Sequence, residues 1–205
     1  PLYMDLSAAD RHDEWNLRAI GALNVLHAGY WLQLIPGSGA VVTALFAADV
    51  GYLVADLGWL IFSPQCVQPS VRRTLLIHHG LVICCVPLAA GRIVLMRHLL
   101  RTWIVELHSW VHIAARRLQW AWAREQLRRA NKPIYCALRL VGFPLTWVAY
   151  SRERAALLPA VRAAIVPTLV HLPLTAAHFA MYGLMCKWGY NLLVAPRGKP
   201  DSERP

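Results

Sequence analysis

Apolar runs of similar length dominate the chain, and short breaks that contain proline, glycine or charged residues separate them. Each run is about as long as the ~20-residue helix that crosses the hydrocarbon layer of a membrane. The pattern predicts membrane spans over residues 15–35, 39–62, 74–90, 97–115 and 133–150.

The last apolar stretch, residues 155–194, is nearly twice as long as one membrane crossing requires at ~1.5 Å per residue. Three prolines interrupt it, and proline breaks or kinks a helix because it lacks the N–H that the helix needs. We therefore expect a short or oblique helix followed by the final span. This gives six spans in total, with seven as the alternative.

Basic residues and tryptophans are interleaved over residues 116–132, between the fourth and fifth spans. This composition is typical of an amphipathic helix that lies in the membrane interface. The predicted fold class is thus all-α: a polytopic membrane protein with about six transmembrane helices and an interfacial basic helix. We expect a membrane domain over residues 15–194, a polar N-terminal segment at 1–14 and a polar C-terminal tail at 195–205.

The 205-residue chain is 57% hydrophobic and only 16% charged, whereas a soluble domain carries about 25% charged residues. This composition argues against a water-soluble enzyme, a disordered chain and a nucleic-acid-binding module. The basic residues behind the net charge of +10 fall mainly between the apolar runs, where cations set the orientation of a membrane protein. With six spans, the basic breaks at 72–73 and 116–132 share one face with the basic tail. Both termini are then expected on the cytosolic or matrix side.

The chain begins at Pro1 without an initiator methionine, and no signal-peptide pattern precedes the first span. An arginine-rich chain of this kind fits a processed mitochondrial import product. We expect an integral membrane protein of an organelle, and we prefer the mitochondrial inner membrane over the endoplasmic reticulum.

Ionisable residues inside the predicted spans are the candidates for function, because a charge inside a bilayer is costly unless it has a partner. Asp49 and Asp56 lie on one face of the second span, and His78 and His79 open the third span at a depth similar to that of Asp56. An aspartate beside an imidazole can orient it for general-base or nucleophilic chemistry. The same pair can form a salt bridge that holds two helices together.

Further ionisable residues are His27 in the first span and Glu106, His108 and His112 in the fourth. His108 and His112 have the helical spacing of two metal ligands. Membrane di-iron hydroxylases and desaturases need a richer set of histidine motifs, so we expect no metal site. For any single histidine, a hydrogen-bonded packing role is the plainer interpretation.

Short motifs follow one another along the predicted spans. They are Glu-Trp-Asn-x-Arg at 14–18, Tyr-x-x-x-Asp-Leu at 52–57, Leu-x-His-His-x-Leu at 76–81, Gly-Arg at 91–92 followed by Glu106, and Arg139 followed by Pro144. In this order and spacing the chain resembles the TLC domain family, the fold shared by ceramide synthases, translocation-associated proteins and several membrane proteins of lipid homeostasis. The resemblance extends over about residues 14–190 and is to the branch that lacks synthase activity.

The resemblance implies six helices around a central cavity that admits a lipid chain. In the ceramide-synthase branch, paired histidines join a fatty acyl group from acyl-CoA to a sphingoid amine. This would make His78 and His79 catalytic and Asp56 the residue that orients them. The other candidates for the lipid cavity are Asp49, Glu106, His27, His108 and Arg139.

The chain departs from the ceramide-synthase motifs at two places, and the expected function follows from these differences. After the paired histidines the chain continues with the apolar residues 80–87, where synthases carry a polar series, and the fourth span has no His-Asp-x-x-Asp motif. We therefore expect a non-catalytic protein that binds membrane lipids and serves as an accessory subunit of a larger organellar membrane complex. We expect no cofactor and no nucleic acid partner. The alternatives are a lipid N-acyltransferase with acyl-CoA as its substrate and an accessory of a translocation channel.

Overall fold

The computed structural model describes residues 7–161 and 166–193, with the backbone alone for 157–161 and 166–171. Every regular element in this part of the chain is helical, which confirms the predicted all-α class. The elements are α1 (Ala8–Trp31), α2 (Gly39–Phe62), η1 (Pro64–Cys66), α3 (Pro69–Ala89), α4 (Ile93–Thr102), α5 (Ile104–Arg117), α6 (Ala121–Tyr135), η2 (Cys136–Gly142), α7 (Phe143–Val161) and α8 (Val166–Leu193).

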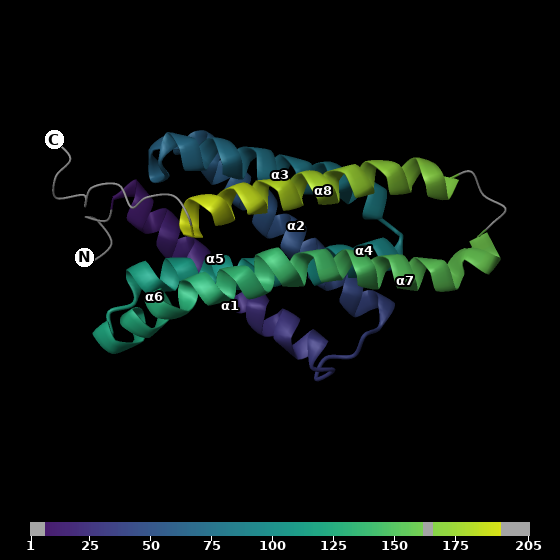
Figure 1. The fold of residues 1–205 in the computed structure, drawn as a ribbon, viewed down its shortest axis with the longest axis horizontal. Helices are drawn as coiled ribbons and strands as arrows, with labels where there is room; N and C mark the ends of the chain where they lie inside the picture. Colours follow the sequence, from purple (N-terminus) through teal and green to yellow (C-terminus); the bar gives the residue numbers. More distant parts are fainter. Residues whose placement is uncertain (1–6, 162–165, 194–205) are drawn as a thin grey trace.

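Most of the long helices lie side by side along the longest direction of the molecule, and α1 crosses the others obliquely (Figure 1). The start of α1 and the end of α8 lie at the same end of the bundle as α6, which we name the α6 end. The end of α7 and the start of α8 lie at the opposite end. Helix α3 packs along α8, and α5 packs against both α1 and α6.

The first helix begins earlier than the sequence predicted. Helix α1 starts at Ala8, and the Ser7 hydroxyl caps it by accepting a hydrogen bond from the backbone N–H of Asp10 at 3.1 Å. The prediction placed the start near Trp15 because the preceding residues are polar and charged. These residues instead form the first turns of the helix, and this brings His12 into the interior, where it is buried.

Helix α2 has the predicted bounds, 39–62. Helix α3, which contains the third apolar run, begins at Pro69 and not at the predicted residue 74. Proline is suited to the first turn of a helix because the backbone N–H groups there have no partner within the helix. The fourth run forms two helices, α4 and α5, that are separated by a turn at Trp103.

The predicted interfacial helix and the predicted fifth span form one continuous helical stretch. Elements α6, η2 and α7 follow one another without a break, and the stretch Ala121–Ala156 is 36 residues long. Pro133, where a new element was expected to begin, lies inside α6. Element η2 is a π-helix, a wider turn that accommodates an extra residue. A Cβ at Gly142 would lie 3.2 Å from the Ala137 carbonyl oxygen, so the last residue of η2 leaves little room for a side chain.

Three stretches of the described chain are both long and apolar enough to cross a membrane, namely α2, α3 and residues 121–156. This is compatible with a membrane protein. Helices α4 and α5 are each too short by themselves because of the turn at Trp103, and α1 is long enough but more polar than the three.

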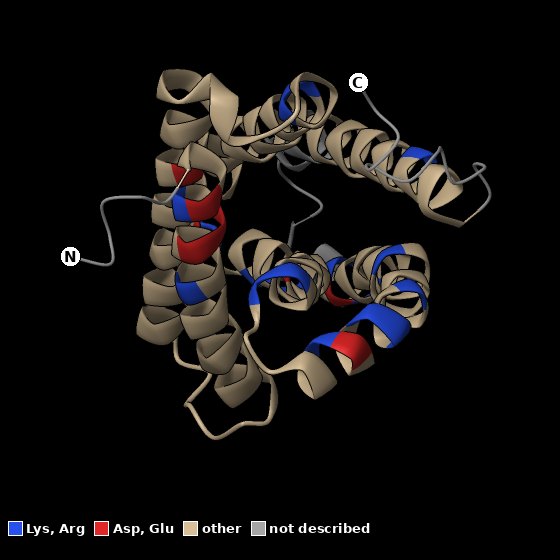
Figure 2. Cartoon of the chain, turned by 90° about the vertical axis from the view of Figure 1, so that its left-hand side faces the viewer, with Lys and Arg blue, Asp and Glu red and all other residues tan. Residues whose placement is uncertain are grey.

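Charged residues gather at the α6 end of the bundle and also pair between α4 and α7. At the α6 end, Arg116 of α5 lies 2.9 Å from Asp13 of α1. Figure 2 views this end and shows acidic and basic residues together on the first turns of α1 and again on α6. Between α4 and α7, Arg101 lies 2.6 Å from Glu153. These pairs connect helices that are distant in the sequence.

Three apolar clusters form the core of the described chain. The largest joins α2, α3, α4, α7 and α8 around Val42 and Leu100, which are fully buried. A second joins α1 and α2 to α5, and a third joins α5, α7 and α8. Buried histidines and carboxylates lie among these clusters, so the interior holds a polar region inside an apolar frame.

Candidate functional site: histidine and carboxylate pairs beside two cavities

Asp56 of α2 is the centre of a buried polar cluster. Its Oδ1 lies 2.7 Å from Nε2 of His12 and accepts a hydrogen bond from the Asn16 amide at 3.2 Å. Its Oδ2 lies 3.3 Å from Nδ1 of His79. Because Asp56 is only 3% exposed, side chains of α1 and α3 take the place of water around both carboxylate oxygens.

The cluster continues one helical turn back along α2. The Tyr52 hydroxyl donates a hydrogen bond to Oδ1 of Asn16 at 2.7 Å. The Trp15 ring stacks on the Tyr52 ring, with 5.4 Å between the ring centroids. These contacts fix α1 against α2 at the position where the Asp56 carboxylate is buried.

His78 faces a different carboxylate from the one that His79 faces. Nε2 of His78 lies 3.7 Å from Oε1 of Glu106 on α5. Adjacent residues of a helix point about 100° apart, so the two histidines can reach two neighbouring helices. The structure thus brings Asp56 to His79 and Glu106 to His78, where the sequence suggested Asp56 as the partner of both.

Arg139 lies in the widened turn of η2 and is only 5% exposed. Its Nη2 donates hydrogen bonds to the Ser109 hydroxyl at 2.6 Å and to the Val105 carbonyl at 3.3 Å. The guanidinium carbon lies 5.3 Å from the centroid of the Trp188 ring and 5.9 Å from that of Tyr135. Among residues 7–161 and 166–193, Arg139 forms no ion pair, and its Nε has no hydrogen-bond partner.

His108 of α5 is a further buried polar residue of this region. It is 7% exposed, and neither ring nitrogen has a hydrogen-bond partner in the described part of the chain. Its ring packs edge-on against Tyr135 at 4.9 Å and lies 6.2 Å from the ring of His112. A buried imidazole with two unmet nitrogens is costly. It therefore marks a position where a bound group would gain hydrogen bonds.

His27 and Asp49 form a separate pair. Nε2 of His27 lies 3.0 Å and 3.1 Å from the two carboxylate oxygens of Asp49. The His27 ring is fully buried and stacks on Trp103 with 5.3 Å between centroids. The Trp103 indole in turn donates a hydrogen bond to Oδ1 of Asn24 at 3.1 Å. This pair ties α1 and α2 to the turn between α4 and α5.

A cavity of about 470 Å³, which we name the polar cavity, lies among α1, α2, α3, α5, α6, η2 and α8. Its wall includes the carboxylates of Asp56 and Glu106 and the guanidinium of Arg139. Its histidines are His12, His78, His79, His108 and His112.

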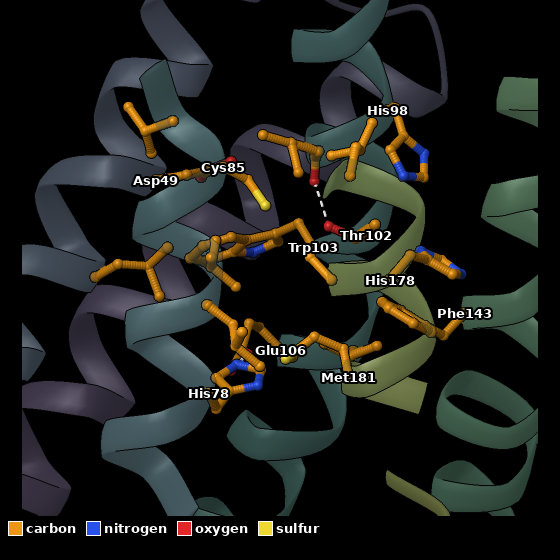
Figure 3. A pocket seen from close by; sticks show the side chains of 18 of the residues that line it. Asp49, His78, Cys85, His98, Thr102, Trp103, Glu106, Phe143, His178 and Met181 are labelled. Carbon is orange, nitrogen blue, oxygen red and sulfur yellow. Dashed lines mark hydrogen bonds and ion pairs between the residues drawn. The ribbon is translucent and has the colours of Figure 1, made fainter. Parts of the chain in front are cut away.

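A smaller cavity of about 80 Å³, the apolar cavity, is lined mainly by apolar side chains of α2, α3, α4, α5 and α8 (Figure 3). Figure 3 shows His78 and Glu106 close together at one end of this cavity and His98 at the other. His78 and Glu106 line both cavities, so their pair stands where the two cavities meet.

The histidine–carboxylate pairs give the site a definite chemical capacity. An imidazole that faces a carboxylate through one nitrogen is oriented and can exchange a proton at the other. His78 and His79 each lie within ion-pair distance of a carboxylate and line the polar cavity, but Nδ1 of His79 makes no hydrogen bond in the described part of the chain. No group of three or more His, Cys, Asp or Glu side chains in the described ranges converges in a way that would hold a metal ion.

The predicted site residues divide between the two cavities. Asp49 lines the apolar cavity, and His27 contacts Asp49 without lining either cavity. The predicted residues that line the polar cavity are His78, His79, Asp56, Glu106, His108 and Arg139.

The sequence did not predict that His12 and Asn16 are partners of Asp56. The predicted span began after His12, which therefore fell in a segment expected to lie outside the membrane domain. A signal was present, because His12 and Asn16 continue the three- and four-residue spacing of the buried positions Ile20, Leu23 and His27.

Comparison of the chain with models of known protein families, with curated proteins and with solved structures finds no match. The resemblance to the TLC family therefore rests on the sequence motifs, and function is inferred from the cavities and the side chains that line them.

Proposed function

We propose that this chain is a polytopic membrane protein of TLC-like fold that binds a single-chain amphiphilic lipid without transforming it. The observation that carries the proposal is the pair of adjoining cavities, one polar and one apolar, that share His78 and Glu106. A lipid with one polar head and one hydrocarbon chain has the same division of polarity.

The volumes support a ligand of modest size. Pockets for small ligands typically measure about 300–1,000 Å³, and the polar cavity, at about 470 Å³, falls in this range. The apolar cavity is much smaller and has room for a short part of a chain. Met181 and Met185 in its wall are unbranched and can adjust to a chain that enters between the helices.

Six membrane passes around this central lipid site are part of the proposal. Helices α4 and α5 together form one pass that bends at Trp103, and α1 and α8 join the three long apolar stretches. The exposed ion pairs at the α6 end support this arrangement, because unpaired charges are costly in the middle of a bilayer. Trp120 and Trp122 beside the basic α6 are 77% and 76% exposed, as expected for tryptophans at an interface. The α6 end then faces the cytosol or matrix.

In this proposal the buried polar groups line the site of the lipid head and hold helices together. Asp56 contacts three side chains from two other helices, so its carboxylate is fixed in place. Acyl transfer by the ceramide-synthase route would require further polar residues after the histidine pair, and residues 80–87 are apolar. The oriented imidazoles therefore act as hydrogen-bonding groups.

A lipid N-acyltransferase is the second candidate, because each of the paired histidines faces its own carboxylate at the wall of the polar cavity. A lipid amine would attack the thioester carbonyl of acyl-CoA, the C–N bond would form as the C–S bond breaks, and His78 would take the amine proton. Loss of acyl transfer in folded His78→Ala protein would support this candidate. Absence of transfer by the wild-type protein from any acyl-CoA would reject it.

We further propose that the protein is an accessory subunit of a larger organellar membrane complex, with the mitochondrial inner membrane preferred over the endoplasmic reticulum. The departures from the synthase motifs and the net charge of +10 support this assignment. After extraction in mild detergent, the protein should migrate with stoichiometric partner proteins. A small particle that holds only this chain and lipid would contradict the subunit role and leave lipid binding intact.

Two neighbouring alanines of α8 allow a matched test of lipid binding. Ala177 lines the apolar cavity, whereas Ala176 is exposed. Ala177→Phe should fill the cavity and lower the molar ratio of lipid to extracted protein several-fold, and Ala176→Phe should keep the wild-type ratio. Mass spectrometry of the extracted lipids measures both.

Circular dichroism serves as the folding control for the two alanine variants. Equal lipid ratios in two folded variants would show that lipid does not occupy the apolar cavity. A wild-type protein that carries no lipid would refute the proposed function as a whole.

A further inference from the structure

A set of unsatisfied hydrogen-bond donors lies on one wall of the polar cavity, where α5 faces η2. We propose that this wall binds an oxyanion, the phosphate or carboxylate of the bound lipid, through Arg139 and His108. The inference rests on the proposed lipid-binding function and adds to it the charge class of the headgroup.

Arg139 is the first element of the site. Its guanidinium is always charged, and the residue is only 5% exposed. It nevertheless forms no ion pair in the described ranges. The Glu106 carboxylate attracts the guanidinium electrostatically but forms no ion pair with it, so an anion in direct contact would add stabilisation. The Nη2 bonds to Ser109 and Val105 and the ring of Trp188 hold the guanidinium in place, while its Nε keeps a donor without a partner.

His108 is the second element. It lines the same cavity as Arg139, and both of its ring nitrogens are buried without a partner in the described part of the chain. Whichever nitrogen carries the proton is a buried hydrogen-bond donor without a partner in the described part of the chain. A planar guanidinium beside an N–H donor is the combination that recognises phosphate and carboxylate oxygens.

The other charged groups of the cavity already have partners. Asp56 is paired with His12 and His79, and Glu106 faces His78. Arg116 is paired with Asp13. The wall of Arg139 and His108 is therefore where an additional negative charge meets a guanidinium without an ion pair and hydrogen-bonding groups without partners in the described part of the chain.

The backbone around Arg139 supports a ligand role. The residue sits in the π-helical segment η2, and π-helical turns inside α-helices occur frequently at functional sites. From this wall, the pair of His78 and Glu106 leads to the apolar cavity. A lipid can thus place its anionic head at Arg139 and direct its chain past that pair.

Two lipids that differ by one phosphate test the inference on the purified, delipidated full chain. 1-Oleoyl lysophosphatidic acid and 1-oleoylglycerol share the glycerol and the acyl chain. The wild-type protein should bind the phosphate-bearing lipid about tenfold tighter or more, as charge-assisted hydrogen bonds allow. Arg139→Gln should remove this preference, so that the two lipids bind with similar affinity.

A control substitution at an exposed arginine and two further substitutions at the site show whether the preference depends on Arg139 and His108. Arg128→Gln, on the exposed face of α6, should keep the wild-type preference. Arg139→Lys should keep part of the preference because it keeps the charge, and His108→Gln should lower it. Circular dichroism and size-exclusion chromatography show in each case whether the variant is folded.

The outcomes separate the two levels of the proposal. Equal wild-type affinity for both lipids, or an unchanged preference in Arg139→Gln, overturns the anion site and leaves lipid binding standing. Binding of neither lipid overturns the proposed function itself. Competition by inorganic phosphate as strong as that by lysophosphatidic acid would support the anion site and identify a free anion as its occupant.

Discussion

Among single residues, Asp56 connects three helices through one buried carboxylate. Removing one partner of a buried charged pair typically costs about 3–5 kcal/mol, because the other partners are left without hydrogen bonds. Asp56→Asn keeps the shape but removes the charge that His12 and His79 face, so we expect a loss of about 3 kcal/mol in the free energy of unfolding. Unfolding in mixed detergent micelles measures it.

The matched control for Asp56→Asn is Glu125→Gln, another change from carboxylate to amide. Glu125 pairs with Arg129 on the exposed surface of α6. Exposed pairs contribute about 0–1 kcal/mol, so this variant should unfold almost as the wild type does. Equal losses in the two variants would show that the Asp56 cluster does not stabilise the fold.

Asp10 lies at the α6 end, before the predicted first span, and its carboxyl group gives a prediction about pH dependence. Its pKa lies below the ordinary value because the Ser7 hydroxyl hydrogen-bonds its carboxylate, and because Arg117 adds a favourable charge. Because the pKa of Asp10 is lower in the folded state than in the unfolded state, its ionised carboxylate stabilises the fold at pH values above the unfolded pKa. This stabilisation is lost as the pH falls through the folded pKa. Arg117→Gln should raise the Asp10 titration midpoint, followed by carboxyl NMR. An unchanged midpoint would remove Arg117 as a cause.

At the level of helices, α1 and α5 approach each other closely at Gly21. A Cβ there would lie 2.9 Å from Nε1 of Trp110, which donates a hydrogen bond to the Leu17 carbonyl at 3.1 Å. Gly21→Ala should displace the indole and cost about 1–3 kcal/mol in the free energy of unfolding. Thermal unfolding in detergent measures the effect.

Gly58→Ala in α2 is the control for this close approach. A Cβ at Gly58 meets no atom within 4 Å, so alanine should be neutral or stabilise the helix by up to about 1 kcal/mol. If Gly21→Ala unfolds at the same temperature as Gly58→Ala, the α1–α5 contact is looser than the structure shows.

The sequence predicted helices well where their ends carry local signals. Ser38 caps the start of α2, and Ser63 with Pro64 follows its end, so the predicted and observed bounds agree. The predicted helix start was wrong where tertiary contacts override local polarity, as in the first turns of α1. The prediction also placed a boundary at Pro133, which the continuous helix accommodates.

The candidate site was predictable only in part. The depth of Asp56 and of the histidine pair followed from counting residues along two connected spans, and the structure places Asp56 beside His79. The pairing of His78 with Glu106 depends on how α5 is rotated about its axis, which packing decides. The position of Arg139 depends on the π-helical turn, and no residue pattern in the chain indicated that turn.

On the scale of the whole molecule, the division of the interior into a polar and an apolar cavity is the feature that a lipid-binding function requires. Buried histidine–carboxylate pairs lie among the apolar clusters, so the helices enclose a polar pocket within an apolar frame. The pair of His78 and Glu106, shared by the two cavities, is where head and chain of a bound lipid would meet.

An experimental density map of the protein, purified from its own membrane into lipid nanodiscs, tests the central claim most directly. The account predicts elongated density that begins beside Arg139, passes His78 and Glu106, and ends in the apolar cavity. Cavities that hold only isolated water peaks, or that are closed by protein side chains, would contradict it.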